Sequence, residues 1–562
     1  MKKKLKYIIL VLPFLFIATG LVLNLIIDLQ TYDGFPPERF SVKYDDNDVP
    51  VIGNIFKPKN KYDKKYPVII YFSGFMAQKD IDPRIPVEFC RRGFLVLTID
   101  IHGHGEMDGS FGSSIITDVK NAIRYVKTNL KEIADVNRIC ILGHSAGGYA
   151  ALGAGTSSVA AAAVWAAPSY YDEKIIYKMN RPLKLYNPSA SVEYLKELNK
   201  SAPYYSLSKN NSDNLLIIHH ESDPVVSIKQ AESIQRKTGA RLIKIGNEKR
   251  AGIFAFINAP LLNHYLIHDS VLIDTINWFE TKLDLKRVKV DENYHFLYLC
   301  KFYFIIIFFT GSFLSVFSLI YILSNKKIAE SVTIESDNIN KSTGYKYQFL
   351  SLFSPLILFG SLFMSHQYVR SLEKIRFNEY FLVPSAILLV FMILYLVLNK
   401  INIISILDLE DIGKSLTIGL YFIIINFLFV WNFKFFVLYP HKFFYYLVSF
   451  IITFPWFFLS GQIIFQFSGN RMLEFVTGKT GINPNRFLVL GNVIPVVTGI
   501  IYYLIFLLIM PKVIAVIIVV FILLILFLYS SYMIYRRYSI TGTAVTNSII
   551  ASFFYGTCYW FF

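Results

Sequence analysis

The sequence is poor in cysteine and in charged residues, and each shortage excludes a class of protein. Four cysteines in 562 residues are too few for a disulfide-rich scaffold. We expect them to be reduced and buried, with a bridge between Cys90 and Cys140 as the alternative if that part of the chain faces an oxidising compartment. Only 17% of the residues are charged and 54% are hydrophobic. This balance excludes a disordered or fibrous protein and is too apolar for an ordinary soluble enzyme.

Acidic residues are also scarce, with 40 Asp and Glu against 56 Lys and Arg, which leaves a formal net charge of +16. A nucleic-acid-binding protein gathers such an excess on one polar face, whereas this chain carries 50 Phe and 37 Tyr. In an apolar chain the surplus more often lies in cytoplasmic loops beside membrane spans. The composition therefore predicts a protein of the lipid bilayer that does not bind nucleic acid.

Residues 1–30 are predicted to form an N-terminal transmembrane anchor. About 20 apolar residues run from Ile8 to Ile27, enough for a helix to cross a bilayer. A cleaved signal peptide is the alternative, but the run is long for one and no A-x-A-like cleavage site follows it. Lys2, Lys3 and Lys4 are expected to hold the N-terminus in the cytoplasm.

Residues 296–562 are predicted to form an all-α bundle of about eight transmembrane helices. Long apolar runs recur at 298–324, 348–368, 380–399, 416–433, 442–467, 487–510, 511–535 and 540–562. If the N-terminus is inside, Lys and Arg are more frequent in the connections that face inward, as the positive-inside rule requires. We therefore expect a multi-pass protein whose middle part lies outside the cytoplasm. The sequence contains no recognisable repeat, ion site or transporter motif.

Residues 36–285 alternate like a soluble α/β domain. Apolar runs that suit the buried strands of a parallel sheet lie at 66–72, 94–101, 138–142, 161–167 and 215–219. Residues 115–130 carry apolar side chains at spacings of three and four, which predicts an amphipathic helix. A last helix is expected over 269–283, capped by its first residues, Asp-Ser. Strands that alternate with helices predict a doubly wound, mostly parallel sheet.

Residues 143–147 read GHSAG, a G-x-S-x-G motif between an apolar run and a small-residue helix. In that setting the motif forms a sharp turn from strand to helix, which presents the serine hydroxyl above the sheet. Glycines are needed because nothing bulky fits beside the serine. The helix that follows has its positive end behind the hydroxyl. Ser145 is therefore the candidate nucleophile.

A serine nucleophile needs a base, and the base needs a carboxylate that orients it. With this motif the acid follows the serine in the chain and the histidine comes last. Asp223 stands in a turn after the apolar run at 215–219, with Glu221 as the alternative. His264, shortly before the last helix, is the candidate base. His268 lies beside the start of that helix, where a capping or surface role suits it better.

Two further segments follow predicted strands. The tripeptide SGF at 73–75 stands where backbone N–H groups of Phe75 and Ala146 would converge on a developing oxyanion. His102 and His104 lie in the turn after the next strand. No cluster of cysteines or carboxylates accompanies them in the sequence, so we predict no metal site there.

Together these motifs resemble the α/β-hydrolase superfamily, in particular its dienelactone-hydrolase and serine-esterase-like branches. The resemblance covers residues 36–285 and rests on SGF at 73–75, DIHGHG at 100–105, GHSAG at 143–147, ESDPVV at 221–226 and the late His264. It implies a site without a cofactor, with nucleophile Ser145, acid Asp223, base His264 and oxyanion donors Phe75 and Ala146. The chain departs from the family pattern at Ser73, where the family has histidine, and at His220, where it has glycine.

An insertion at 169–208 carries seven tyrosines. We expect it to cap the serine and either to hold an acyl chain or aryl group or to pack on the core. The favoured function is a membrane-anchored serine hydrolase that acts on a carboxylic ester, a lipid or another small acyl compound. One alternative is an acyltransferase that uses the same acyl-enzyme and an acceptor held by the bundle. The other is a transporter or receptor with a non-catalytic outer domain. The sequence does not indicate an oligomeric state.

Overall fold

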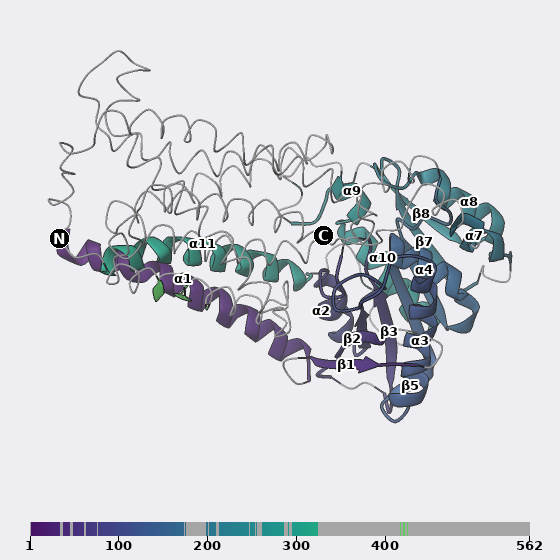
Figure 1. Cartoon of the computed structure of the whole chain (residues 1–562), viewed down its shortest axis with the longest axis horizontal. Coiled ribbons are helices and arrows are strands. Elements are labelled where there is room, and N and C mark those ends of the chain that lie inside the picture. Colours follow the sequence, from purple (N-terminus) through teal and green to yellow (C-terminus); the bar gives the residue numbers. More distant parts are fainter. Residues whose placement is uncertain are drawn as a thin grey trace, which may run out of the picture. The chain divides into compact units, whose positions relative to one another are not determined.

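The computed structural model describes residues 2–323 apart from short gaps, together with residues 416, 417, 420, 421 and 424 (Figure 1). The gaps fall at 34–36, 45–48, 61–62, 76, 173–174, 176–197, 201, 210–212, 247, 253–254, 256–260, 286–289 and 291–294. Contacts divide the chain into two compact units, and the one that holds residues 20–306 contains the α/β domain.

The domain is built on an eight-stranded sheet with the order β1-β2-β4-β3-β5-β6-β7-β8. The strands are β1 Glu38–Val42, β2 Val51–Phe56, β3 Tyr66–Phe72, β4 Leu95–Ile99, β5 Ala134–His144, β6 Ala161–Trp165, β7 Leu215–His220 and β8 Arg241–Ile245. β2 runs antiparallel to both β1 and β4, whereas all the other neighbours are parallel. The predicted α/β-hydrolase fold with a mostly parallel sheet is thus confirmed.

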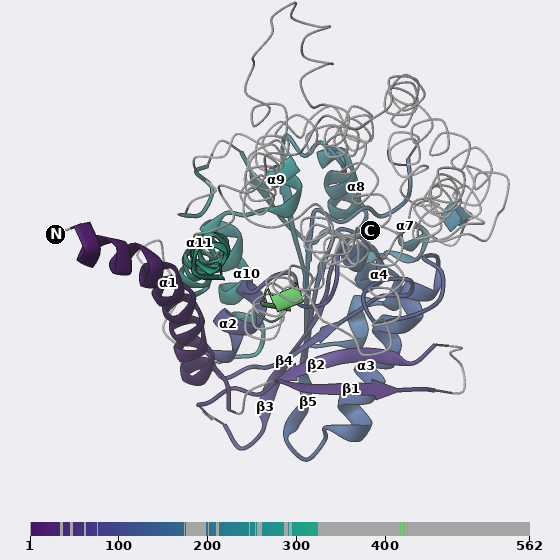
Figure 2. The same cartoon turned by 60° about the vertical axis from the view of Figure 1, so that its left-hand side comes forward.

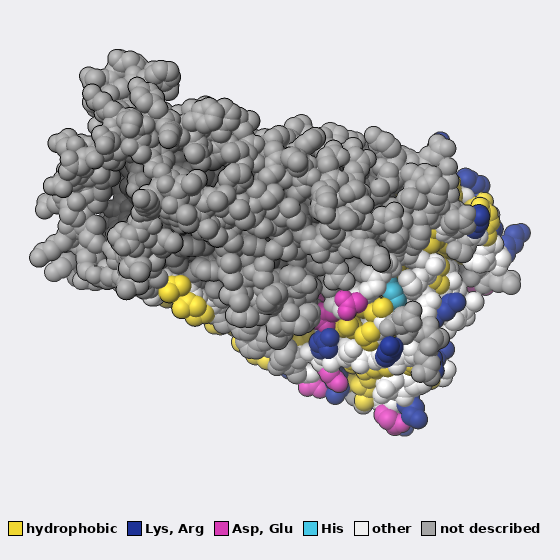
Figure 3. All heavy atoms as spheres, viewed as in Figure 1, with side chains coloured by type: hydrophobic (Ala, Val, Ile, Leu, Met, Phe, Trp, Pro, Cys, Tyr) yellow, Lys and Arg dark blue, Asp and Glu magenta, His cyan; other side chains and the backbone are white. Residues whose placement is uncertain are grey.

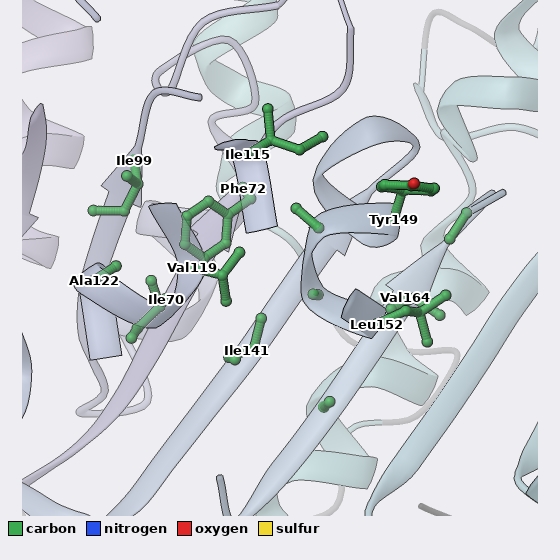
Figure 4. Close-up of a cluster of buried hydrophobic side chains, with 14 of the residues drawn as sticks. Ile70, Phe72, Ile99, Ile115, Val119, Ala122, Ile141, Tyr149, Leu152 and Val164 are labelled. Atoms are coloured by element: carbon green, nitrogen blue, oxygen red, sulfur yellow. The ribbon is translucent and has the colours of Figure 1, made fainter. Parts of the chain in front are cut away.

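Helices cover both faces of the sheet (Figure 2). They are α2 Arg84–Cys90, α3 Ser114–Asn129, α4 Ala146–Ala154, α7 Pro203–Ser206, α8 Ile228–Thr238, α9 Leu261–Tyr265 and α10 Asp269–Lys282, with a 3-10 turn η1 at Thr156–Ser158. Alternate residues of β3 enter two cores. Ile70 and Phe72 pack with α3 and α4 (Figure 4), and Tyr71 packs with α2 and α10. Burial on both faces explains why the central strands are almost wholly apolar.

The five predicted strands are all present, with β5 longer than expected. The predicted cap of α10 is wrong in detail. The helix begins at Asp269 itself, and His268 occupies the preceding cap position without a side-chain cap bond. Cys90 and Cys140 are buried free thiols, so the alternative of a bridge between them is excluded.

Two long apolar helices are described, α1 Lys2–Thr31 and α11 Tyr298–Leu323. Within the described residues, one helical stretch, Val11–Thr31, is long and apolar enough to cross a membrane, a test that a signal sequence also passes. Figure 3 shows hydrophobic side chains exposed along α1. Leu15 and Val22 are among the exposed large hydrophobic residues of this helix. The first predicted span of the bundle is a helix, α11. Of the predicted span at 416–433 only residues 416, 417, 420, 421 and 424 are described, and the remaining six spans and most of the insertion at 169–208 fall outside the described residues.

Candidate active site

Ser145 occupies the turn between β5 and α4. Its backbone has φ +51 and ψ −114, a conformation that a residue with a side chain adopts only under strain. The strain is balanced by two hydrogen bonds: the Ser145 N–H donates to the carbonyl of Trp165 in β6 (2.8 Å), and the Ser145 carbonyl accepts from the N–H of Tyr149 (2.9 Å). The turn therefore holds the serine at the carboxyl edge of the sheet, as the motif predicted.

The glycines of the motif are required by close backbone contacts. A β-carbon on Gly143 would lie 2.5 Å from the carbonyl oxygen of Gly147, and one on Gly147 would lie 2.3 Å from that of Phe72. Neither space accommodates a carbon atom. The turn can thus close only with glycine at both positions, and Gly147 brings the start of α4 against the end of β3.

Ser145, His264 and Asp223 form a continuous hydrogen-bonded chain. His264 Nε2 lies 3.0 Å from Ser145 Oγ, and His264 Nδ1 lies 2.8 Å from Asp223 Oδ2. A carboxylate only accepts, so Nδ1 carries the proton and donates it, and Nε2 is free to accept from the serine hydroxyl. All three residues are buried. This arrangement can transfer the serine proton to the imidazole.

The loop after β7 orients the carboxylate of Asp223. Its Oδ1 accepts hydrogen bonds from the N–H groups of Val225 (2.7 Å) and Val226 (3.0 Å). Burial by itself raises the pKa of Asp223, but the imidazole of His264, the nearby His219 and the hydrogen bond from the Val225 N–H outweigh burial and lower the pKa below its usual value. Asp223 is therefore ionised at neutral pH and able to stabilise a positively charged imidazole.

The structure distinguishes between the two carboxylates and between the two histidines that sequence left open. Asp223 contacts His264, whereas Glu221 is exposed. His264 contacts Ser145, whereas the ring of His268 lies 5.5 Å from that of His220. The expected capping or surface role of His268 is wrong, because the side chain makes no cap bond and is buried.

The segment after β3 lies directly against the serine. A β-carbon on Gly74 would lie 3.2 Å from the β-carbon of Ser145 and 2.9 Å from His144 Nδ1. Ser73, which stands where the family has histidine, is buried and donates its hydroxyl to the Ala77 carbonyl (3.2 Å). Phe75 follows in this loop, and Ala146 begins α4. The two expected oxyanion donors thus belong to the two segments that flank Ser145.

His102 and His104 have other contacts. His102 Nδ1 lies 2.6 Å from Asp118 Oδ1, and its backbone N–H donates to Asp118 Oδ2 (2.9 Å). The ring of His104 packs edge-on against Phe75, 5.3 Å between centroids, and burial lowers its pKa to about 4. Over the part of the chain that is described, no group of three or more His, Cys, Asp or Glu side chains could hold a metal ion.

Sequence reasoning missed a buried ion pair beneath this loop. Lys79 Nζ lies 2.9 Å from Asp100 Oδ2, and the Lys79 N–H donates to Asp100 Oδ1 (2.7 Å). Burial alone would lower the pKa of Lys79, but Asp100, Asp80 and Glu106 raise it above its usual value. A single lysine in a turn carries no sequence signal for such a role. The pair connects the loop after β3 to the loop after β4.

Part of the domain also matches a protein-family model. The esterase-like family BD-FAE matches residues 54–180, which include β3, the loop after it and Ser145. The domain has the α/β-hydrolase fold, and this match supports a serine hydrolase. The match covers 127 of 562 residues (180 − 54 + 1).

Solved structures similar to this hydrolase include the α/β-hydrolase GrgF from Penicillium sp. sh18, at 16% identity and TM-score 0.35, over 45% of this chain and 100% of that one. The Pyrococcus furiosus esterase Pf2001 is similar at 18% identity and a TM-score of 0.31, over 38% of this chain and 83% of that one. The Thermogutta terrifontis esterase Est2 is similar at 21% identity and a TM-score of 0.33, over 45% of this chain and 97% of that one. The chain has no match among curated proteins.

Proposed function

We propose that the protein is a membrane-anchored esterase that cleaves a carboxylic ester or lipid acyl group, with Ser145 as nucleophile, His264 as base and Asp223 as the orienting acid. The observation that carries the proposal is the chain of contacts from Ser145 Oγ through His264 to Asp223, at 3.0 and 2.8 Å. The esterase-like family match supports the substrate class. Such a triad needs no cofactor.

The reaction runs in two halves. Ser145 Oγ attacks the substrate carbonyl carbon while His264 Nε2 takes the hydroxyl proton, and the N–H groups of Phe75 and Ala146 bind the oxyanion. The C–O bond to the alcohol breaks, and the alcohol leaves with the proton from His264. Water then attacks the acyl-enzyme and gives a proton to His264. The serine–acyl bond breaks, the acid leaves, and Ser145 regains its proton. Asp223 stays ionised throughout and holds the imidazole.

We further propose that α1 is a retained anchor. Near the end of α1, the side chains of Asn24 and Asp28 are buried. Lys301 in α11 donates to Asp28 Oδ1 (2.6 Å) and to Asn24 Oδ1 (2.9 Å). Removal of α1 would leave the ammonium of Lys301 buried without these partners, which is costly in an apolar setting. The contact therefore favours an anchor over a cleaved signal peptide.

The wider organisation is proposed on the sequence pattern: an anchor at 1–30, the hydrolase at 36–285 and a multi-pass bundle at 296–562. The positive-inside bias puts the N-terminus in the cytoplasm and the hydrolase outside it. In sealed vesicles of known orientation, protease added from the extracytoplasmic side should cleave the hydrolase domain. N-terminal sequencing of the mature protein should show that the whole of α1 is still present. A domain protected from that side would contradict the topology.

A fluorophosphonate probe tests the enzyme proposal, because it reacts with an activated serine hydroxyl. The full-length protein in detergent should be labelled, and Ser145→Ala should not. Ser158→Ala, which removes an exposed hydroxyl in η1, is the matched control and should be labelled like the wild type. Equal labelling of wild type and Ser145→Ala, or no labelling of either, would refute the proposal.

A series of p-nitrophenyl esters of increasing acyl length then defines the substrate class. Preference for long chains would indicate a lipid, and preference for acetate a small ester. The same reactions run with an added alcohol reveal acyl transfer, because the product is then a new ester as well as the free acid. Free acid as the sole product supports hydrolysis.

A further inference from the structure

The backbone around His264 is held by two side chains that belong to neither the triad nor the loop after β3. The carbonyl oxygen of His264 accepts a hydrogen bond from His144 Nε2 (2.9 Å). The next two carbonyls, those of Tyr265 and Leu266, accept from Arg84 Nη2 (3.2 Å) and Nη1 (2.8 Å). Three consecutive carbonyls are thus fixed from outside their own segment. We call these contacts the carbonyl clamp.

The segment needs such support because of its local conformation. α9 is only five residues long and ends at Tyr265, so its last carbonyls have no partners within the helix. Leu266 follows with φ +51, a left-handed conformation that costs a leucine about 1–3 kcal/mol unless its surroundings enforce it. A short helix that ends in a strained residue would not by itself keep the imidazole of His264 in one place.

Arg84 is itself rigidly held. It is buried, and the carboxylate of Asp82 binds its Nε (2.9 Å) and Nη2 (2.7 Å). Its guanidinium also lies 4.9 Å from the ring centroid of Trp165 in β6. The guanidinium is planar and carries its donors in a fixed fork. Asp82 and Trp165 therefore aim the remaining N–H groups at the two carbonyls after the base.

His144 joins the base segment to the nucleophile turn, since it directly precedes Ser145 in the chain. Its ring is buried, 5.5 Å from the ring of Tyr265, and its Nδ1 faces Gly74 in the loop after β3. Burial, together with the nearby His264, lowers the pKa of His144 to about 3, so the ring is neutral and carries one proton. A carbonyl can only accept, which assigns that proton to Nε2.

We propose that Arg84 and His144 are positioning residues for the base: they hold the backbone of His264 so that its Nε2 stays within hydrogen-bonding distance of Ser145 Oγ. This inference rests on the proposed serine-hydrolase function. It adds residues about 180 and 120 positions away from the base segment in the sequence, which contact it only in the folded domain. Neither side chain reacts with the substrate, and each acts through His264.

The test compares Arg84→Met and Arg84→Lys with Arg92→Met. Arg92 is similarly buried near the end of α2 but donates to the carbonyl of Glu88, so it controls for the loss of a buried arginine. Because misplacing a catalytic group by about 1 Å costs about 10²-fold, Arg84→Met should lower kcat by about that factor with little change in KM. Arg84→Lys should restore part of the loss, and Arg92→Met should keep kcat.

His144 is tested in the same way by His144→Gln and His144→Phe. The glutamine amide can donate to the His264 carbonyl in place of Nε2–H, whereas phenylalanine fills the space without a donor. We expect His144→Gln to retain more of kcat than His144→Phe. Equal kcat in the two variants would remove His144 from the inference.

A measurement independent of activity separates this inference from the proposed function. Deuterium uptake by the backbone amides of residues 261–268 should rise in Arg84→Met and stay at the wild-type level in Arg92→Met. Unchanged uptake, or a kcat in Arg84→Met equal to that in Arg92→Met, overturns the positioning role even if the probe labels Ser145. If uptake rises but the wild type is not labelled, the clamp holds the segment and the proposed function fails.

Discussion

Gly147 lies where the nucleophile turn meets the loop after β3, and replacing it with alanine tests that contact. A β-carbon at this position would lie 2.3 Å from the carbonyl oxygen of Phe72 and 2.6 Å from that of Ser73. Real β-carbons essentially never come within 3.0 Å of such atoms, so the two segments must separate by about 0.7 Å (3.0 − 2.3). Both contacts are to backbone, and no side-chain rotation relieves them.

The separation displaces the two segments that carry the proposed oxyanion donors, Phe75 and Ala146. A misplacement of this size costs on the order of 10²-fold in rate, and the loss of one oxyanion donor costs ~10²–10³-fold. We therefore expect Gly147→Ala to lower kcat/KM by about 10²-fold. Overpacking also destabilises a domain by about 1–3 kcal/mol, which leaves most of the protein folded.

The assay is ester hydrolysis by full-length protein in detergent, together with urea unfolding of the same preparation. Gly246→Ala is the control, because its nearest neighbour would be the flexible carboxylate of exposed Glu221 at 3.3 Å, which can move aside. A folded Gly147→Ala protein with the kcat/KM of Gly246→Ala would refute the reasoning. It would mean that catalysis does not depend on the packing of the turn against the loop after β3.

Two further predictions concern the acid and a buried histidine. Asp223→Asn should lower kcat by about 10⁴-fold, because the amide favours the wrong tautomer of His264; initial rates measure this, and a near wild-type kcat would show that Asp223 does not orient the base. The pKa of His104 is lowered by burial to about 4, against 6.5 for an ordinary histidine. The folded state therefore binds fewer protons between these values, and stability present above pH 6.5 is lost as the pH falls towards 4. The urea midpoint should fall over this range, and it should fall less in His104→Phe; equal slopes would contradict the assignment.

The central strands could be read from the sequence, and the edge strands could not. β3, β4, β6 and β7 are nearly continuous apolar runs because both of their faces are covered. β1 and β8 lie at the two edges of the sheet and carry exposed polar residues, so no run marks them. β2 is buried but is interrupted by Gly53 and Asn54, and it was missed for that reason.

One part of the candidate site could likewise be predicted from the sequence, and the other part could not. Ser145 was recognisable from five consecutive residues, because the strained turn can be made only with glycines beside it. The choice of His264 over His268 depends on which imidazole reaches Ser145, and the choice of Asp223 over Glu221 depends on which carboxylate reaches that imidazole. A separation of two or four residues in a loop does not specify either contact. Hydrogen bonds of 3.0 and 2.8 Å in the folded domain decide it.

The sequence by itself determined the α/β class, the nucleophile turn and the apolar helix at the N-terminus, since each depends on residues close together in the chain. Only the tertiary structure decided the contacts of His268, the Lys79–Asp100 pair and the clamp formed by Arg84. These are long-range contacts between buried polar groups. A buried polar side chain takes whichever partner the packing of the sheet and helices brings within reach, and no local pattern of residues encodes that partner.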